Sequence, residues 1–485
     1  MRKRFEADLV LGQKPIHKTP ISLKEKGALI ELIAALKLIF ITPEYNDKIF
    51  RIIEDFLSSK KLKKGREGMN LWTIFVLSQV RLCLNISYEA LHSLANNHFS
   101  LRHVIGAERD FGYERIEFEY QNIYDNVSLL DEETVKQLNE IILAFGHNVF
   151  KKKEAAPLHL KTDSFVVESN VHFPTDYNLL WDCTRKCLDT LEYFQQKYGE
   201  IEGWRKIKNW RSETKGYMRE LGKTSSSGGK DKDKRIKSAA NNYLTKARLL
   251  MDKLAKTMPS LALNDMSDLA AHLTLEHFKE LAHKHINLVE RRLINGETIP
   301  HEEKMFSVFE KYTEMIKKGK LHPNVELGKK LAITTDQFNL IVDYHIMENE
   351  QDRDIVIKLA DRVLANNKVS SWSFDKGYWG KDNKNILKLV VPTVVIPKLG
   401  KRNQEEEQEE KSRIFKRLKN KHSAVESNIN ELENRGLDRC PDKGYRHFKR
   451  YIGLAVSAYN LKKIGRALLD QERQKQKETL LRIAA

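Results

Sequence analysis

The chain has 485 residues, of which 41% are hydrophobic and only 11 are proline, so it is long enough for several domains with substantial cores and is not disordered. Its 84 Lys and Arg residues outnumber 67 Asp and Glu residues, and the formal charge of +17 favours polyanionic partners, nucleic acid first. No apolar run approaches the roughly 20 residues that span a bilayer, and the start MRKRFEADLV lacks the apolar segment of a secretory signal, so we expect a cytoplasmic protein with no membrane partner.

Residues 1–150 are predicted to form a helical domain. The segment GMNLWTIFVLSQVRLCLNISYEALHSLANNHF has the spacing of two helices joined around Asn85-Ile86-Ser87, and Ser87 is predicted to cap the second helix. The arrangement is similar to a helix-turn-helix, which places one helix in a major groove, but helix pairs are also common packing units. The domain is therefore a candidate for DNA-end binding or dimerisation.

The pattern changes in residues 151–177, where apolar side chains alternate from Phe165 to Phe173. This alternation predicts a strand or hairpin that supplies the first two strands of a sheet. The parity of the apolar positions slips near Asp163, as it would at a bend or a β-bulge. Asp163 is therefore predicted to lie where a strand changes direction.

Residues 178–328 return to helical spacing and are predicted to be a helical insertion. Its segment 222–235, GKTSSSGGKDKDKR, has the composition of a flexible basic loop, which fits either a contact with a phosphate backbone or a solvated surface. The chain has only four cysteines, too few for a disulfide framework, and Cys183 and Cys187 lack the further ligands of a zinc site.

Residues 329–470 are predicted to complete the sheet, and residues 471–485 to form a helical tail. FNLIVDYHIM and VSSWSF have strand character on either side of a helical segment, and ILKLVVPTVVIPK fits a buried strand from Val390 to Pro397. A late helix, HSAVESNINELEN, ends near Gly436. This order of elements predicts a mixed α/β sheet interrupted by a helical insertion.

Three acidic residues fall where such a sheet usually holds ligands. Asp163 lies at the predicted bend, Asp375 at the end of a strand, and Glu426 beside the apolar stripe of the late helix. Acids from separate elements can converge on one sheet edge and hold hard divalent cations such as Mg²⁺. A solvated charge is the commoner role of any single acid, and other acids compete on pattern alone: Asp336, Asp343, Glu168, Glu431 and Glu433.

Three blocks of the chain resemble the DDE transposases of bacterial and archaeal insertion sequences, most closely the ISNCY-type group. They are KTDSFVVESNVHFPTDYNLLWDCTRK, DYHIMENEQDRD through SFDKGYWG, and HSAVESNINELENRGLDRCPDKGYRHFKRYIGLAVSAYNLKKIGR. The segments ISYEALHSL and YQNIYDNVSLLDEE extend the resemblance into the N-terminal helices. It covers most of the chain from about residue 65.

The resemblance implies an RNase H-like catalytic core with a helical N-terminal DNA-binding domain and a large helical insertion between the second and third strands. It implies that Asp163, Asp375 and Glu426 bind two Mg²⁺ ions, for which Mn²⁺ can substitute. The implied activity is DNA transposition by a prokaryotic, nucleoid-associated protein. Such a protein binds terminal inverted repeats, cleaves the DNA at the element's ends and joins them to target DNA, as a homodimer at least on DNA.

One feature departs from related transposases, which carry Arg four residues before the glutamate and Lys seven residues after it. This chain has His422 and Glu433 at those positions, so the phosphate contacts of that Arg and Lys cannot be assigned. His422, one helical turn from Glu426, is a candidate catalytic residue that contacts phosphate or orients water, and a structural histidine fits equally well. Asn430, one turn to the other side, is a weaker candidate of the same kind.

Six further residues are candidate DNA contacts. A basic cluster after the late helix fits either a contact with the DNA backbone or a solvated face: Lys443, Arg446, Lys449 and Arg450. Tyr378 and Trp379, beside Asp375, are candidates for stacking on an unpaired base, although aromatic residues after a strand more often belong to a core.

Two other functions share most of these features. A catalytically inactive or domesticated copy would bind specific DNA without cutting it, and an RNase H-like nuclease would cut DNA without joining its ends. The intact acid triad argues against the inactive copy.

Overall fold

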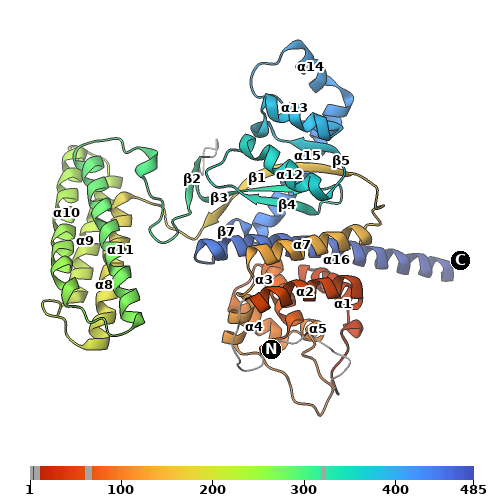
Figure 1. The fold of residues 1–485 in the computed structure, drawn as a ribbon, viewed down its shortest axis with the longest axis horizontal. Helices are drawn as coiled ribbons and strands as arrows, with labels where there is room; N and C mark the ends of the chain where they lie inside the picture. The colour runs from red at the N-terminus through yellow and green to blue at the C-terminus, as the bar shows by residue number, and fades with distance from the viewer. Residues whose placement is uncertain (1–3, 5–10, 60–67, 318–323, 485) are drawn as a thin grey trace. The chain divides into compact units, whose positions relative to one another are not determined.

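The computed structural model describes residue 4 and residues 11–59, 68–317 and 324–484. The chain divides into a main unit, Met1–Asn170 with Ile316–Ala485, and a helical unit, Val171–Met315 (Figure 1). Across the described ranges, no single helix is both long enough and apolar enough to span a membrane.

The N-terminal part of the main unit is helical, as the spacing predicted. Asn70 caps α3 through a hydrogen bond from the Thr73 N–H, and Asn85 ends it in the left-handed conformation. Ser87 caps α4 as predicted, and the two helices meet at 120°. The helices are α1 (Ala28–Ile41), α2 (Pro43–Ser59), α3 (Leu71–Leu84), α4 (Tyr88–Asn97), α5 (Phe99–Val104), α6 (Tyr120–Val127) and α7 (Glu132–Val149).

A mixed sheet forms the centre of the main unit. β1 pairs antiparallel with β3 and parallel with β5, β3 pairs antiparallel with β4, and β5 pairs parallel with β6. The strands are β1 (Leu158–Ser169), β2 (Glu314–Lys317), β3 (Val325–Thr335), β4 (Ile341–Ile346), β5 (Val369–Phe374), β6 (Thr393–Val395) and β7 (Arg439–Cys440). The strand order is β2-β3-β1-β5-β6, with β4 also paired to β3 and β7 to β1. This mixture of antiparallel and parallel pairing confirms the predicted mixed α/β, RNase H-like fold class.

The predicted hairpin in residues 151–177 is wrong. β1 is one continuous strand whose pairing with β3 runs unbroken from Lys161 to Glu168, so Asp163 lies at neither a bend nor a bulge. Apolar residues occur on both faces of β1 because it is a central strand with both faces covered, and this is why their alternation changes near Asp163. The helical unit therefore follows the first strand of the sheet rather than the second.

Helices cover both faces of the sheet. On one face Trp372 and Phe374 of β5 lie in an apolar core with side chains of α12 and α13. On the opposite face α15 packs against β1, β5 and β6. The helices after β4 are the short turn η6 (Asp352–Ile355), α12 (Val356–Asn366), α13 (Lys381–Val390), α14 (Gln404–Lys411), α15 (Arg413–Leu432) and α16 (Tyr445–Ala484).

The long helix α16 joins the sheet to the N-terminal helices. It packs against α1, α3 and α7 and touches β4, and Figure 1 shows it running between the two parts. It continues without a break through residue 470, so the predicted tail is the exposed end of the same helix.

The helical unit has a core of its own, built from α8 (Asp176–Tyr198), α9 (Ile207–Ser226), α10 (Lys232–Thr257) and α11 (Met266–Val289). The predicted flexible loop 222–235 is mostly helical: α9 continues to Ser226 and α10 begins at Lys232. Lys and Asp are compatible with helix ends, and the helical pattern breaks from Ser227 to Asp231, where Gly229 has φ +103° and Asp231 has φ +54°. Cys183 and Cys187 are buried free thiols of this core.

Candidate active site

The register of the sheet brings Asp163 and Asp375 together. β1 and β5 run parallel, and Thr162 is paired with Phe374, so the next residue of each strand, Asp163 or Asp375, follows at the same level. Asp163 shares a face with Ser373, because side chains alternate along each strand. Asp375 leaves β5 and begins the turn η7 (Lys376–Tyr378), where it is exposed.

Glu426 reaches the same place from α15. Val425, Ile429 and Leu432 form the buried stripe of this helix, and Glu426 stands beside it, exposed. α15 packs on β1 and β5, and the charge of Glu426 acts on Asp163. Asp375 and Glu426, from two further elements, therefore lie within electrostatic reach of Asp163.

This concentration of negative charge changes the acidity of Asp163. Burial raises the pKa of its carboxyl group to about 7, and the charges of Asp375, Asp352 and Glu426 act in the same direction. A hydrogen bond of 2.7 Å from the Ser164 N–H to its Oδ1 opposes the rise. Burial and like charge thus both oppose the ionisation of Asp163.

Asp352, at the start of η6, was not predicted to belong to this site. Its Oδ1 accepts a hydrogen bond of 2.7 Å from Ser164 Oγ, and its Oδ2 lies 2.7 Å from Nζ of Lys330. A Cβ added to Gly377 would lie 3.2 Å from that Oδ2, so the turn after Asp375 passes close to the same carboxylate. In the sequence, an acid at the start of a helix is a common capping residue, which hid this role.

His422 lies one turn before Glu426 and faces the sheet. Its ring is buried, and its Nδ1 lies 3.1 Å from Oγ of Ser373 on β5. Burial lowers its pKa to about 4, so the ring is neutral at pH 7, and within the described residues its Nε2 has no hydrogen-bond partner. This position fits a residue that fixes α15 against β5 better than one that contacts phosphate.

A known family model matches the part of the chain that carries Asp375 and Glu426. Residues 294–461 match the family model of the transposase DDE domain. The chain contains a transposase DDE domain. The resemblance to DDE transposases is confirmed, while its ISNCY-type subgroup stays a prediction. No curated protein and no solved structure matches the chain.

The match covers about a third of the chain and includes Asp375 and Glu426. Asp163 lies upstream of it, because the helical unit separates β1 from the rest of the sheet. The pairing of β1 with β3 and β5 nevertheless makes β1 the central strand of the DDE domain. Asp163 therefore belongs to the domain by structure although the family match does not reach it.

The predicted basic cluster lies away from these carboxylates. It follows β7, whose Cys440 pairs with Ser169, six residues beyond Asp163 along β1 and so about 20 Å away. Lys443 and Arg446 are exposed.

Two members of the cluster are already engaged. Lys449 lies within 3.7 Å of Glu132 and 3.6 Å of Glu348. The prediction for Arg450 is wrong, because its side chain is 4% exposed and pairs with Asp442 at 2.9 Å, which also binds Arg81 at 2.7 Å.

The two aromatic candidates beside Asp375 differ. The Tyr378 ring is 1% exposed and packs 5.4 Å from the Phe374 ring, so it has no face for a base and that prediction is wrong. Trp379 is half-buried against the same core, and Nζ of Lys398 lies 5.5 Å from its ring centre. Its stacking on DNA stays a prediction.

The donor set at this edge of the DDE domain fits Mg²⁺. Carboxylate oxygens are its preferred protein ligands, and a bound cation would offset the burial and like charge that raise the pKa of Asp163. Within the described parts of the chain, no three His, Cys, Asp or Glu side chains stand close enough to form a ready-made metal cage. The three acids therefore do not form a closed ligand set by themselves.

Proposed function

We propose that this protein is an insertion-sequence transposase that binds the terminal inverted repeats of its element, cleaves the DNA at the ends and joins them to target DNA. The observation that carries the proposal is the match of residues 294–461, which include Asp375 and Glu426, to the transposase DDE domain, beside the strand β1 that carries Asp163. Joining two ends requires two such sites, so a homodimer on DNA is part of the proposal.

The side chains have separate tasks in this proposal. Asp163, Asp375 and Glu426 would hold Mg²⁺ or Mn²⁺, two ions per site, through their carboxylate oxygens. Such ions, when bound, activate a water or a 3′-hydroxyl and stabilise the leaving oxygen at phosphorus. Asp352 orients the Ser164 segment next to Asp163, and His422 fixes the position of α15 against β5.

The proposal is supported by the different placement of the three carboxylates. Asp163 is fixed within the central strand by ladders on both sides, whereas Asp375 stands in a turn and Glu426 on a helix surface. A half-buried ligand on a central strand and two exposed ones leave the outer side of the site open to a DNA phosphate, which in-line displacement at phosphorus needs.

The test uses purified protein and a plasmid that carries the gene with its flanking DNA, with Mg²⁺ or with EDTA, followed by sequencing of broken and joined ends. We expect cuts at defined ends only with Mg²⁺, their loss in Asp375→Ala, and joined products. The matched control is Asp361→Asn, an exposed carboxylate on α12 of the same domain, which should cut normally.

The other outcomes identify the alternatives. Cut but unjoined ends under joining conditions would indicate a nuclease. DNA binding without cleavage in Mg²⁺ or Mn²⁺ would indicate an inactive or domesticated binding protein. Cleavage by Asp375→Ala at the wild-type rate would refute the assigned site.

A further inference from the structure

A second site lies in the N-terminal helical part, on the loop 105–119 between α5 and α6. A loop of this length without helix or strand is uncommon in a compact domain, and such loops often carry function. The N-terminal segment pairs with this loop: Lys14 N–H donates to the Glu108 carbonyl at 3.2 Å, and Asp110 N–H donates to the Gly12 carbonyl at 2.7 Å.

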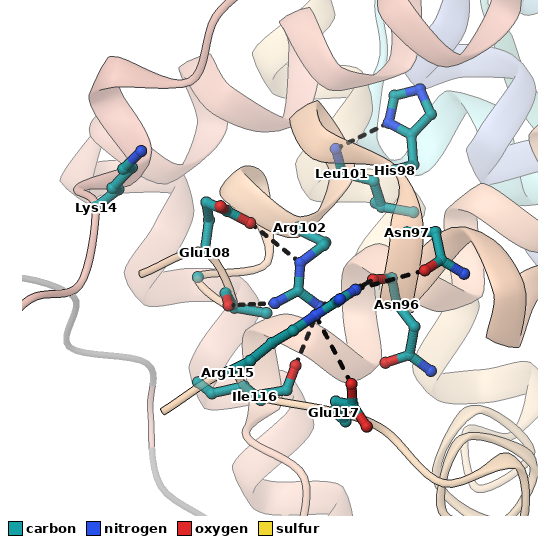
Figure 2. Close-up of polar contacts among 12 residues, drawn as sticks. Lys14, Asn96, Asn97, His98, Leu101, Arg102, Glu108, Arg115, Ile116 and Glu117 are labelled. Atoms are coloured by element: carbon teal, nitrogen blue, oxygen red, sulfur yellow. Dashed lines mark hydrogen bonds and ion pairs between the residues drawn. The ribbon is translucent and has the colours of Figure 1, made fainter. Parts of the chain in front are cut away.

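Arg102 on α5 fixes the base of this loop. Figure 2 shows its guanidinium at the centre of the contacts. It donates to Glu108 Oε2 at 3.0 Å and to the carbonyls of Ala107 at 2.9 Å and Ile116 at 3.0 Å. Arg102 is buried and fully engaged, so it is a structural arginine and its charge is balanced by Glu108.

Two other arginines of the loop are less fully engaged than Arg102. Arg109 has a buried Nε without a hydrogen-bond partner, and across the described ranges no ion pair engages its guanidinium. Arg115 is half-exposed, donates to the carbonyl of Asn96 and lies 3.8 Å from the exposed Glu117. An unpaired buried guanidinium nitrogen is costly unless a ligand satisfies it, so Arg109 points to an anion.

Aromatic side chains stand beside these cations. A cleft of about 340 Å³ is lined by Asn97, Phe99, Arg102, Glu108, Arg109, Tyr113 and Arg115. Phe99 and Tyr113 keep about half of their surface exposed, and Nζ of Lys14 lies 5.7 Å from the Phe99 ring centre. Phe111, at the tip of the loop, is fully exposed.

The Tyr113 ring packs directly against the backbone of Gly12. Gly12 has φ +75°, and a Cβ at that position would collide with the Tyr113 ring. The ring is thus held against the N-terminal segment while its outer surface stays open. A rigid, exposed aromatic ring next to an unpaired arginine matches the groups that hold single-stranded nucleic acid, a cation for phosphate and a π-face for a base.

We infer that this cleft binds DNA, with Arg109 and Arg115 on the phosphodiester backbone and Phe99 and Tyr113 against an unpaired base. The inference rests on the proposed function, which makes DNA the substrate. The excess of 84 Lys and Arg over 67 Asp and Glu favours DNA over an acidic protein segment of limited length. The cleft contacts DNA ends where strands are unpaired, while the carboxylate site performs the reaction.

The experiment measures binding of the full chain by fluorescence anisotropy in EDTA, so that cleavage does not contribute. The probes are a labelled duplex copied from the DNA flanking the gene and the same duplex with a short unpaired extension. Arg109→Ala and Arg115→Ala should each reduce the slope of log affinity against log salt by about one. Phe99→Ala with Tyr113→Ala should weaken binding of the extended duplex roughly tenfold more than binding of the paired duplex.

Two variants control for charge and folding. Arg51→Ala removes an exposed arginine of α2, which lies 3.6 Å from Asp47, and should leave the salt slope unchanged. Arg109→Lys keeps the charge and should keep the slope. If Arg109→Ala does not fold, Arg115→Ala, at the exposed edge of the cleft, decides the result.

Unchanged affinity and salt slope in the cleft variants would overturn the inference, even if the wild-type protein cuts DNA ends. A change in oligomeric state without a change in DNA affinity would overturn it as well. Loss of binding in these variants with a wild-type protein that never cuts would support the cleft and refute the proposed function instead. The two failures are therefore distinguishable.

Discussion

Asp163→Asn should stabilise the metal-free protein at high pH. The pKa of Asp163 rises from 3.8 to about 7 in the folded chain, so the folded state holds the proton more tightly than the unfolded state. Stability is therefore lost as pH rises from 3.8 to about 7. A shift of this size, at about 1.4 kcal/mol per pKa unit, corresponds to about 4 kcal/mol above pH 7, and asparagine avoids that cost.

The assay compares thermal unfolding of wild type and variant in EDTA, at about pH 8 and about pH 4.5. The variant should melt higher by roughly 5 °C at the higher pH, and the gain should largely disappear at the lower pH. Asp361→Asn, an exposed carboxylate, should show no such pH-dependent gain.

Magnesium ions provide the second arm of this test. Mg²⁺ should stabilise the wild type at the higher pH, because binding favours the ionised carboxylate, and should stabilise Asp163→Asn less. The claim that burial and like charge raise the pKa of Asp163 would be refuted by a variant that melts below the wild type at high pH in EDTA. It would also be refuted by a change in melting temperature that is the same at both pH values.

Three further predictions concern Asp352 beside the candidate site, His285 in the helical unit and Asp442 in the main unit. Asp352→Asn should raise the Mg²⁺ concentration needed for half-maximal cleavage several-fold, with little change in DNA binding, because it loosens the segment beside the site. Burial lowers the pKa of His285 from 6.5 to about 4, so the unfolded chain binds a proton at this residue before the folded chain does as pH falls. About 3 kcal/mol of stability should therefore be lost between these two pH values. His285→Leu should retain that stability, and denaturant titration at both pH values measures it. Asp442→Ala should destabilise the main unit by about 3 kcal/mol in thermal unfolding, because it leaves Arg81 and Arg450 buried without their shared carboxylate.

The sequence predicted those elements whose signals are local. Ser87 caps α4 through the hydrogen bond expected of an N-cap, and Gly436, at φ +103°, lies just beyond the end of the helix that carries Glu426. Asp375 follows β5 as the strand pattern indicated. Each of these features depends on a few consecutive residues.

The incorrect predictions arise where a structure depends on contacts between residues that are distant in the sequence. The apolar residues up to Phe173 continued the strand alternation, but β1 ends at Ser169 and Thr175 caps α8. The strand β3 escaped prediction because lysines interrupt its apolar pattern. Lys330 is one of these, and its role is clear only when Asp352 stands beside it. Arg450 likewise looked like a surface charge until Asp442 and the carbonyl of Ser128 were placed around it.

The placement of the helical unit shows why the family match and the site have different boundaries. Asp163 is separated from Asp375 by an entire folded unit, yet β1 is held by β3 on one side and β5 on the other. The two ladders fix Asp163 in position whatever the helical unit does, so that unit can vary without moving the site. The exposed acids have weaker supports, a turn for Asp375 and the His422–Ser373 contact for Glu426. Precision at this site therefore depends most on α15, since a one-residue shift of that helix along β5 would carry Glu426 away from Asp163 while leaving the sheet intact.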